Sequence, residues 1–188
     1  MMKQSQITYW CHEIIRSQAQ KSGLYIDATM GKGNDTLMLC ELAGEAGEVF
    51  AFDIQGQAVD ATRTLLEKHE VTTKYHLVLD GHENMDNYIQ AGCADVICFN
   101  FGYLPGGDHN LATKKDSSIE AIHEGLRLLK KGGMMSLCIY SGGDSGFEEL
   151  DAILEELKTL DGKKYLVILS QYYNRPNNPP IPAMVIKM

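Results

Sequence analysis

Two glycines and a carboxylate in the first third of the chain have the types and spacing of a nucleotide-binding turn. The apolar run 24–28 is followed closely by Gly31 and Gly33, which can turn the backbone tightly and let a ligand approach it. Asp53, 22 residues beyond Gly31, ends the next apolar run, where a carboxylate would accept both hydroxyls of an adenosine ribose. The glycine pair alone fits an ordinary strand-to-helix turn, and Asp53 is what favours a nucleoside cofactor.

The residues around this turn narrow the choice of cofactor. Asn34 or Asp35 can cap the helix that follows, and Thr36 stands where the dinucleotide fingerprint has its third glycine. Lys32 lies inside the turn, and no G-K-[ST] sequence follows it, which disfavours a P-loop. Asp27 on the first strand suits a methionine ammonium group and would repel a pyrophosphate. The pattern favours S-adenosyl-L-methionine (SAM) over NAD.

A third polar group follows the third apolar run. Asp80 could accept a hydrogen bond from an adenine amino group, or Asp80 or His82 could instead cap the next helix. The sequence leaves both roles, the adenine contact and the helix cap, open. The predicted cofactor-binding residues are Asp27, Thr29, Gly31, Gly33, Asn34, Asp35, Asp53, Gln55, Asp80, His82 and Glu83.

Short apolar runs alternate with helical patterns along most of the chain, which predicts a parallel sheet covered by helices. The seven predicted strands are Leu24–Ala28, Glu48–Phe52, Tyr75–Leu79, Ala94–Phe99, Met134–Ile139, Tyr165–Leu169 and Ala183–Ile186. Capping boxes at 117–120 and 145–148 each predict the start of a helix, with Gly132-Gly133 and Gly162 as the respective stops.

The last two strands are separated only by the Asn- and Pro-rich segment Gln171 to Pro182, in which no helix fits. They should therefore form an antiparallel hairpin. We expect an α/β fold: a doubly wound, Rossmann-like seven-stranded sheet, mostly parallel with an antiparallel last strand, in the element order of class I methyltransferases.

Composition limits the remaining possibilities. With 188 residues and 44% hydrophobic content, the chain predicts a single domain over 1–188. Five scattered cysteines indicate reduced core residues, and no metal site is expected. No apolar run approaches the ~20 residues of a membrane span, so we expect a cytoplasmic protein without a membrane partner. The net charge of −8 opposes indiscriminate binding to phosphate backbones.

The segment after the fourth strand, 100–108, resembles the Asn-Pro-Pro-Tyr segment of amine methyltransferases, with Phe101 and Gly102 in place of the prolines. The resemblance implies that the Asn100 amide accepts hydrogen bonds from an amine and directs its lone pair to the methyl donor. An aminomethyl group is mostly protonated at neutral pH, so a proton acceptor would help. The candidates are Tyr103, Asp108 and His109. The alternative is a glycine-rich surface loop without a catalytic role.

Four motifs together, at 27–35, 82–83, 100–108 and 174–180, resemble one family of small methyltransferases labelled rRNA methylases, and the likeness covers nearly the whole chain. The family includes a tRNA methyltransferase that methylates 5-aminomethyl-2-thiouridine at the wobble position. The resemblance implies SAM as cofactor, an amine acceptor, and the anticodon region of tRNA as substrate and partner.

The predicted hairpin places its connecting segment at the carboxyl edge of the sheet, beside the acceptor. Aromatic, amide and cationic groups there suit an unstacked nucleotide; a solvated hairpin is the alternative. The predicted substrate-binding residues are Tyr140, Tyr172, Arg175 and Asn177. A small-molecule or rRNA methyltransferase, a Rossmann-type oxidoreductase and a non-catalytic cofactor-binding module remain as other functions. The sequence leaves the oligomeric state open, a homodimer included.

Overall fold

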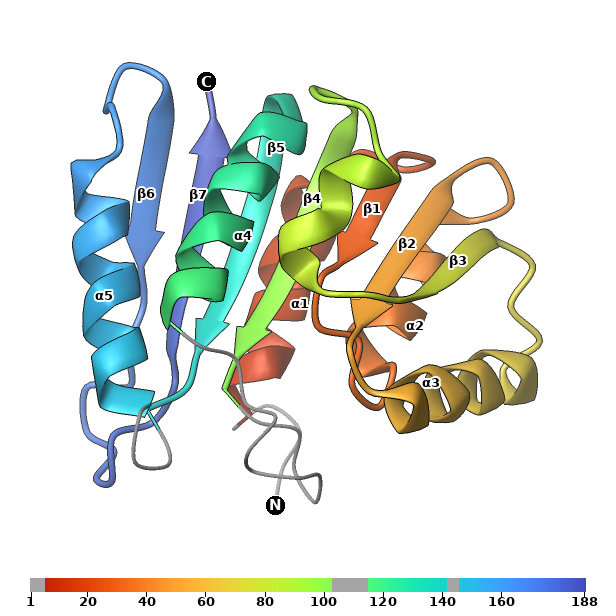
Figure 1. The fold of residues 1–188 in the computed structure, drawn as a ribbon, viewed down its shortest axis with the longest axis horizontal. Helices are drawn as coiled ribbons and strands as arrows, with labels where there is room; N and C mark the ends of the chain where they lie inside the picture. Colours follow the sequence, from red (N-terminus) through yellow and green to blue (C-terminus); the bar gives the residue numbers. More distant parts are fainter. Residues whose placement is uncertain (1–5, 103–114, 142–145) are drawn as a thin grey trace.

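The computed structural model describes residues 6–102, 115–141 and 146–188 (Figure 1). Seven strands form one sheet in the order β3-β2-β1-β4-β5-β7-β6. Only β7 runs antiparallel to its neighbours β5 and β6. The strands are β1 (Leu24–Asp27), β2 (Glu48–Asp53), β3 (Lys74–Leu79), β4 (Ala94–Phe101), β5 (Leu129–Ile139), β6 (Tyr165–Leu169) and β7 (Ile181–Lys187). The predicted fold class is confirmed, with strand limits that shift by a few residues.

Helices cover both faces of this sheet. Figure 1 shows α4 and α5 in front of the sheet and α1 and α2 behind it. The helices are α1 (Ile7–Gln18), α2 (Asn34–Ala43), α3 (Gly56–Lys68), the short 3-10 helix η2 (His82–Asn87), α4 (Lys115–Leu128) and α5 (Gly146–Thr159). Ile122 and Ile153 belong to one buried apolar cluster, and Ile15 and Leu39 belong to the other. The central strands are apolar on both faces because each face is covered.

The start of α4 differs from the prediction. The capping box placed the first turn after Ser117, but the helix already includes Lys115. Ser118 therefore lies within the helix, where its buried hydroxyl donates a hydrogen bond of 2.5 Å to the Glu149 carboxylate of α5. The serine satisfies a buried carboxylate between two helices, a role that local sequence does not reveal. Ser145, from the second box, lies outside the described residues.

The predicted end of α4 is also wrong. The helix ends at Leu128 and β5 begins with the next residue, so Gly132-Gly133 lies within the strand and does not stop the helix. Lys187 of β7 donates to the carbonyls of Leu126 and Leu129 at 2.8 and 2.7 Å and satisfies the helix end. A Cβ atom on Gly133 would lie 2.9 Å from the Ala94 carbonyl oxygen, so the close approach of β4 requires glycine.

The hairpin of β6 and β7 is confirmed. Its loop, residues 170–180, is at the edge of the sheet where β4 and β5 end, the lower edge in Figure 1. The Ser141 hydroxyl after β5 donates to the Asn178 carbonyl at 3.1 Å and fastens the loop there. Strand β7 begins at Ile181, two residues earlier than expected, and so includes Pro182. Among the described residues, no helix is long and apolar enough to cross a membrane.

Candidate active site

The turn after β1 is held in a conformation that only glycine adopts easily. Gly31 and Gly33 have φ angles of 51° and 78°. A Cβ atom on Gly33 would lie 2.9 Å from the hydroxyl oxygen of Thr62, a buried residue of α3. The space beside Gly33 is therefore filled by α3, and the predicted close approach of a ligand to this turn stays a prediction. Sequence reasoning missed Thr62 because nothing nearby in the chain marks it.

The helix cap in this turn is not the predicted one. Gly33 occupies the N-cap position of α2 and makes no side-chain capping bond, and Asn34 and Asp35 lie in the first helical turn. Asn34 is exposed. A left-handed glycine starts the helix because Thr62 leaves no space for a side chain there.

Asp53 ties the first two strand ends together. One carboxylate oxygen accepts from the Gly31 N–H at 3.0 Å, and the other accepts from the Gln55 N–H at 2.9 Å. The glycine turn and this carboxylate thus lie in direct contact, and the ribose contact predicted for Asp53 stays a prediction. Gln55 is itself buried, and its side-chain carbonyl accepts from the Gln57 amide at 2.7 Å.

Asp27 lies beneath the turn and not on its surface. Its fully buried carboxylate accepts from the Thr36 hydroxyl at 2.5 Å and from the Thr29 N–H at 3.2 Å. Burial, reinforced by the negative charge of Asp35, raises the pKa of Asp27 from 3.8 to about 7. The contacts with Thr29 and Thr36 support the turn from within, whereas the prediction placed this carboxylate against a ligand.

The capping alternative for Asp80 and His82 is wrong, because Gly81 is the N-cap of η2 and the helix has no side-chain capping bond. The Asp80 carboxylate accepts from the Gly81 N–H, the Asn84 amide and the Tyr88 hydroxyl at 2.8 to 2.9 Å. The bonds from Asn84 and Tyr88 lower the pKa of Asp80. The adenine contact predicted for this residue stays a prediction.

His82 packs edge-on against the rings of Phe99 and Phe101, with centroids 6.0 Å away, and burial lowers its pKa. It thus forms part of the core beneath the third strand end. Glu83 beside it is half-buried.

Two apolar side chains at the same edge were missed by sequence reasoning. Ile54, directly after Asp53, is 56% exposed, and Leu79, directly before Asp80, is 61% exposed. Exposed apolar groups beside two carboxylates provide the combination that an adenosine needs, a flat apolar contact and polar acceptors. Their position directly after and before the predicted carboxylates is the signal that could have found them.

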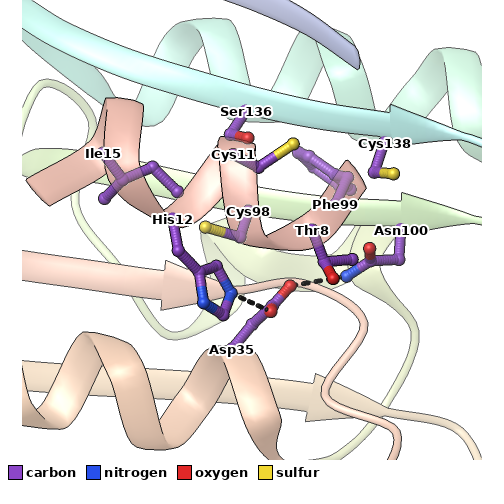
Figure 2. A pocket seen from close by; sticks show the side chains of 10 residues that line it. All are labelled: Thr8, Cys11, His12, Ile15, Asp35, Cys98, Phe99, Asn100, Ser136 and Cys138. Carbon is purple, nitrogen blue, oxygen red and sulfur yellow. Dashed lines mark hydrogen bonds and ion pairs between the residues drawn. The ribbon is translucent and has the colours of Figure 1, made fainter. Parts of the chain in front are cut away.

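Asn100, at the end of β4, is joined to the turn after β1. Its backbone N–H donates to the Thr29 hydroxyl, and its side-chain nitrogen donates to Asp35, each at 2.7 Å. The second Asp35 oxygen lies 2.6 Å from His12 Nε2 of α1 (Figure 2). Because a carboxylate only accepts, Nε2 carries the proton of this bond. Sequence reasoning gave α1 no functional role, so it missed His12.

A small cavity lies beside this cluster, between α1 and the ends of β4 and β5. Its lining residues are Thr8, Cys11, His12, Ile15, Asp35, Cys98, Phe99, Asn100, Ser136 and Cys138 (Figure 2). Burial raises the pKa of the Cys98 thiol, and the Cys138 thiol is hydrogen-bonded to Cys11 and Tyr140. All five cysteines are free and four of them are buried, as expected, but the burial predicted for Cys93 is wrong, because this residue is exposed.

The remaining predicted residues divide into two groups. Tyr103, Asp108 and His109 lie outside the described residues. On the hairpin loop, Arg175 and Asn177 are exposed and Tyr172 is half-buried. Tyr173, another of the aromatic groups expected to contact a nucleotide, is 96% exposed.

Tyr140, by contrast, is turned partly inward. Burial, reinforced by its Cys138 partner, raises the pKa of its phenol. In the described part of the chain, no three His, Cys, Asp or Glu side chains gather as a metal site.

This sheet order, with its glycine turn and acidic second strand end, defines the class I SAM-dependent methyltransferase fold. The pattern of the family described as Putative rRNA methylase matches residues 49–186. A structure from Clostridium thermocellum with that description is 39% identical, with a TM-score of 0.93 and full coverage of both chains. The chain belongs to this family.

Of two further relatives, one was solved with a bound ligand and the other is named for its substrate. A candidate methyltransferase from Streptococcus mutans, solved in complex with SAH, is 34% identical with a TM-score of 0.88, again over both whole chains. The chloroplastic tRNA (mnm5s2U34)-methyltransferase of Arabidopsis thaliana is 32% identical over 89% of this chain. The chain spans 65% of the length of that plant relative.

Proposed function

We propose that this chain transfers a methyl group from SAM to an amine, and that the amine is the 5-aminomethyl group of 2-thiouridine at the tRNA wobble position. The observation that carries the methyl-transfer part is the left-handed turn at Gly31 and Gly33, in which the Gly31 N–H donates to Asp53 at 3.0 Å. The tRNA part rests on the plant relative and on the exposed hairpin loop.

The described residues fit a SAM molecule. The turn brings the Gly31 backbone to Asp53, whose carboxylate supplies ribose acceptors, and Ile54 offers an exposed apolar surface for the adenine. When bound, SAM supplies an electrophilic methyl group on a sulfonium, and its departing sulfur takes the electron pair of the broken C–S bond. These residues hold the donor at the carboxyl edge and take no covalent part.

Asn100 carries the acceptor side of the proposal. An amine attacks through a neutral lone pair, so the enzyme must orient the nitrogen and exclude water. The Asn100 amide lies at the end of β4, where the cofactor turn and the hairpin loop share one edge of the sheet. A carbonyl oxygen there can accept an N–H of the amine and leave its lone pair free. One proton leaves the nitrogen for each methyl group transferred.

The wobble uridine belongs to the proposal because the hairpin loop combines exposed Tyr173, Arg175 and Asn177. Together these groups offer stacking, a cation and an amide, the contacts that unpaired nucleotides use. A local site of this kind operates despite the net charge of −8, since the charge concerns the whole surface and not this loop. A cytoplasmic location with reduced cysteines is part of the same proposal.

The decisive experiment is mass spectrometry of tRNA nucleosides after incubation with methyl-labelled SAM. Undermodified tRNA carrying 5-aminomethyl-2-thiouridine should gain one labelled methyl group on that nucleoside. Label in rRNA or in small amines, with none in any tRNA uridine, would contradict the tRNA substrate. Calorimetry with SAM and NAD separately tests the cofactor, and tight binding of NAD alone would refute methyl transfer.

A further inference from the structure

A chain of two hydrogen bonds runs from α1 to the Asn100 amide. His12 Nε2 lies 2.6 Å from one oxygen of Asp35, and Asn100 Nδ2 lies 2.7 Å from the other. We propose that Asp35 and His12 are positioning residues that fix the Asn100 amide with its carbonyl oxygen toward the methyl acceptor. This inference rests on the proposed function and deepens it, because it names what selects the acceptor group.

The need for such a device follows from the shape of an amide. The oxygen and NH2 ends of asparagine are nearly isosteric, so a half-turn of the side chain exchanges an acceptor for a donor. The Asp35 carboxylate can only accept, so the nitrogen end of Asn100 must face it. Figure 2 shows the amide nitrogen directed at Asp35 and the oxygen directed away. The Asn100 backbone is held as well, through its N–H bond to Thr29.

His12 has a different task, which is to hold Asp35. The two side chains are 17% and 16% exposed, so the pair is largely shielded from water and worth more than a surface pair. With one oxygen held by His12, the carboxylate cannot rotate and its second oxygen stays on Asn100. Distances of 2.6 and 2.7 Å are those of hydrogen bonds in which one partner is charged.

The orientation has a consequence for substrate choice. An outward carbonyl oxygen accepts a hydrogen bond from a group that carries N–H, and an outward NH2 would repel it. A primary amine can give one N–H to Asn100 and keep its lone pair for the methyl group. A tertiary amine has no N–H to give. The hydrogen bonds from His12 to Asn100 therefore favour amines that carry an N–H, primary or secondary, over tertiary amines.

Exchange of the two side chains tests the orientation. In Asp35→Asn, the new amide keeps its carbonyl for His12 and turns its NH2 to Asn100, which must flip. In Asn100→Asp, two carboxylates face each other. We expect each single variant to lose about 10- to 100-fold in turnover at saturating SAM. The double variant Asp35→Asn/Asn100→Asp restores both bonds with a carboxylate oxygen outward, and should recover to within about tenfold of wild type.

Matched variants at position 12 test the hydrogen bond between His12 and Asp35. Replacement of His12 by Gln keeps an N–H donor and should retain most of the turnover, whereas His12→Phe removes the donor and should lower kcat more than it raises the KM for tRNA. A double exchange variant no better than the worse single variant would overturn the proposal. So would a loss of SAM affinity in Asp35→Asn with unchanged turnover at saturating SAM, which would return Asp35 to the cofactor site as the sequence predicted.

A readout independent of activity separates this inference from the proposed function. In the 15N–1H NMR spectrum, the Asn100 side-chain NH2 signal, assigned by its absence in Asn100→Asp, should be shifted downfield and lose this shift in Asp35→Asn. If the wild type methylates no amine, the proposed function fails and the signal still decides the orientation. An Asn100 signal that Asp35→Asn leaves unchanged would overturn it.

Discussion

The two ends of the carboxyl edge hold their polar groups in opposite ways. After β1 and β2, the polar side chains bond to the protein itself: Asp27 to Thr36, and Asp53 to the Gly31 backbone. After β6, Tyr173 and Arg175 project into solvent from a loop fastened by Ser141. The first arrangement is preorganised, and the second offers adaptable contacts on an anchored base.

The difference matches what each end is proposed to bind. A small cofactor of fixed shape gains affinity from groups that need no reordering. A flexible nucleotide in a large RNA is contacted better by side chains that can adjust to it. Substitutions at the first end should therefore affect folding or cofactor affinity, and those at the second should affect the RNA substrate alone.

The largest expected effect concerns Asp27. Its raised pKa of about 7 means that the folded state holds a proton that the unfolded chain releases near pH 4. The stability from this residue is thus complete below about pH 4, falls as the pH rises to about 7, and stays lost above it. Replacement by Asn, which mimics the protonated form, should stabilise the protein by up to about 4 kcal/mol at pH 8.

Urea unfolding of Asp27→Asn and wild type at pH 4, 6 and 8 measures this effect. Replacement of the exposed Asp60 by Asn is the matched control and should give no such trend. A difference between Asp27→Asn and wild type that does not grow with pH would show that the buried carboxylate is paired well enough to ionise without cost.

The next effect in size concerns the glycine turn. Gly33→Ala introduces a Cβ atom 2.9 Å from Thr62 at a left-handed backbone and should cost about 2–3 kcal/mol of stability. Gly92 has a similar φ of 75° with no atom within 4 Å of a Cβ, so Gly92→Ala should cost only about 1 kcal/mol. Thermal unfolding compares the two. Equal losses would mean that the contact with α3 does not constrain the turn.

A smaller loss is expected at Asp53, and it should appear in cofactor affinity. Removing its charged acceptors in Asp53→Ala should weaken SAM binding by about 1–3 kcal/mol while the fold remains intact. Calorimetry with SAM measures the change, with Asp60→Ala as the control for loss of one negative charge. Unchanged affinity would remove Asp53 from the binding site and leave it only its contact with the Gly31 backbone.

Contacts within this structure also differ in how far the sequence alone could predict them. The position of Gly31 and Asp53 at one edge was accessible because Gly31 follows the first strand, Asp53 ends the second, and strand ends of a parallel sheet meet at one edge. His12 and Lys187 were not accessible: each acts on an element distant in the chain, and only packing brings them together. The capping box at 117–120 does not mark the start of α4, which already includes Lys115, and the Ser118 contact between helices was not accessible from local sequence.

The smallest effect is expected on the hairpin loop. Arg175 is exposed at the carboxyl edge, so an RNA phosphate can reach it without a change in the fold. Arg175→Ala should lower kcat/KM for tRNA by about fivefold at low salt and reduce the slope of log(kcat/KM) against log[salt] by about one, with SAM affinity near wild type. Lys163→Ala is the matched control, because it removes the same charge from the turn before β6, at the opposite edge of the sheet. If Arg175 and Lys163 variants show the same salt dependence, the effect belongs to the net charge of the protein and the hairpin loop does not contact the RNA. A lower SAM affinity in Arg175→Ala alone would instead place the loop against the cofactor and remove the distinction between the two ends of the edge.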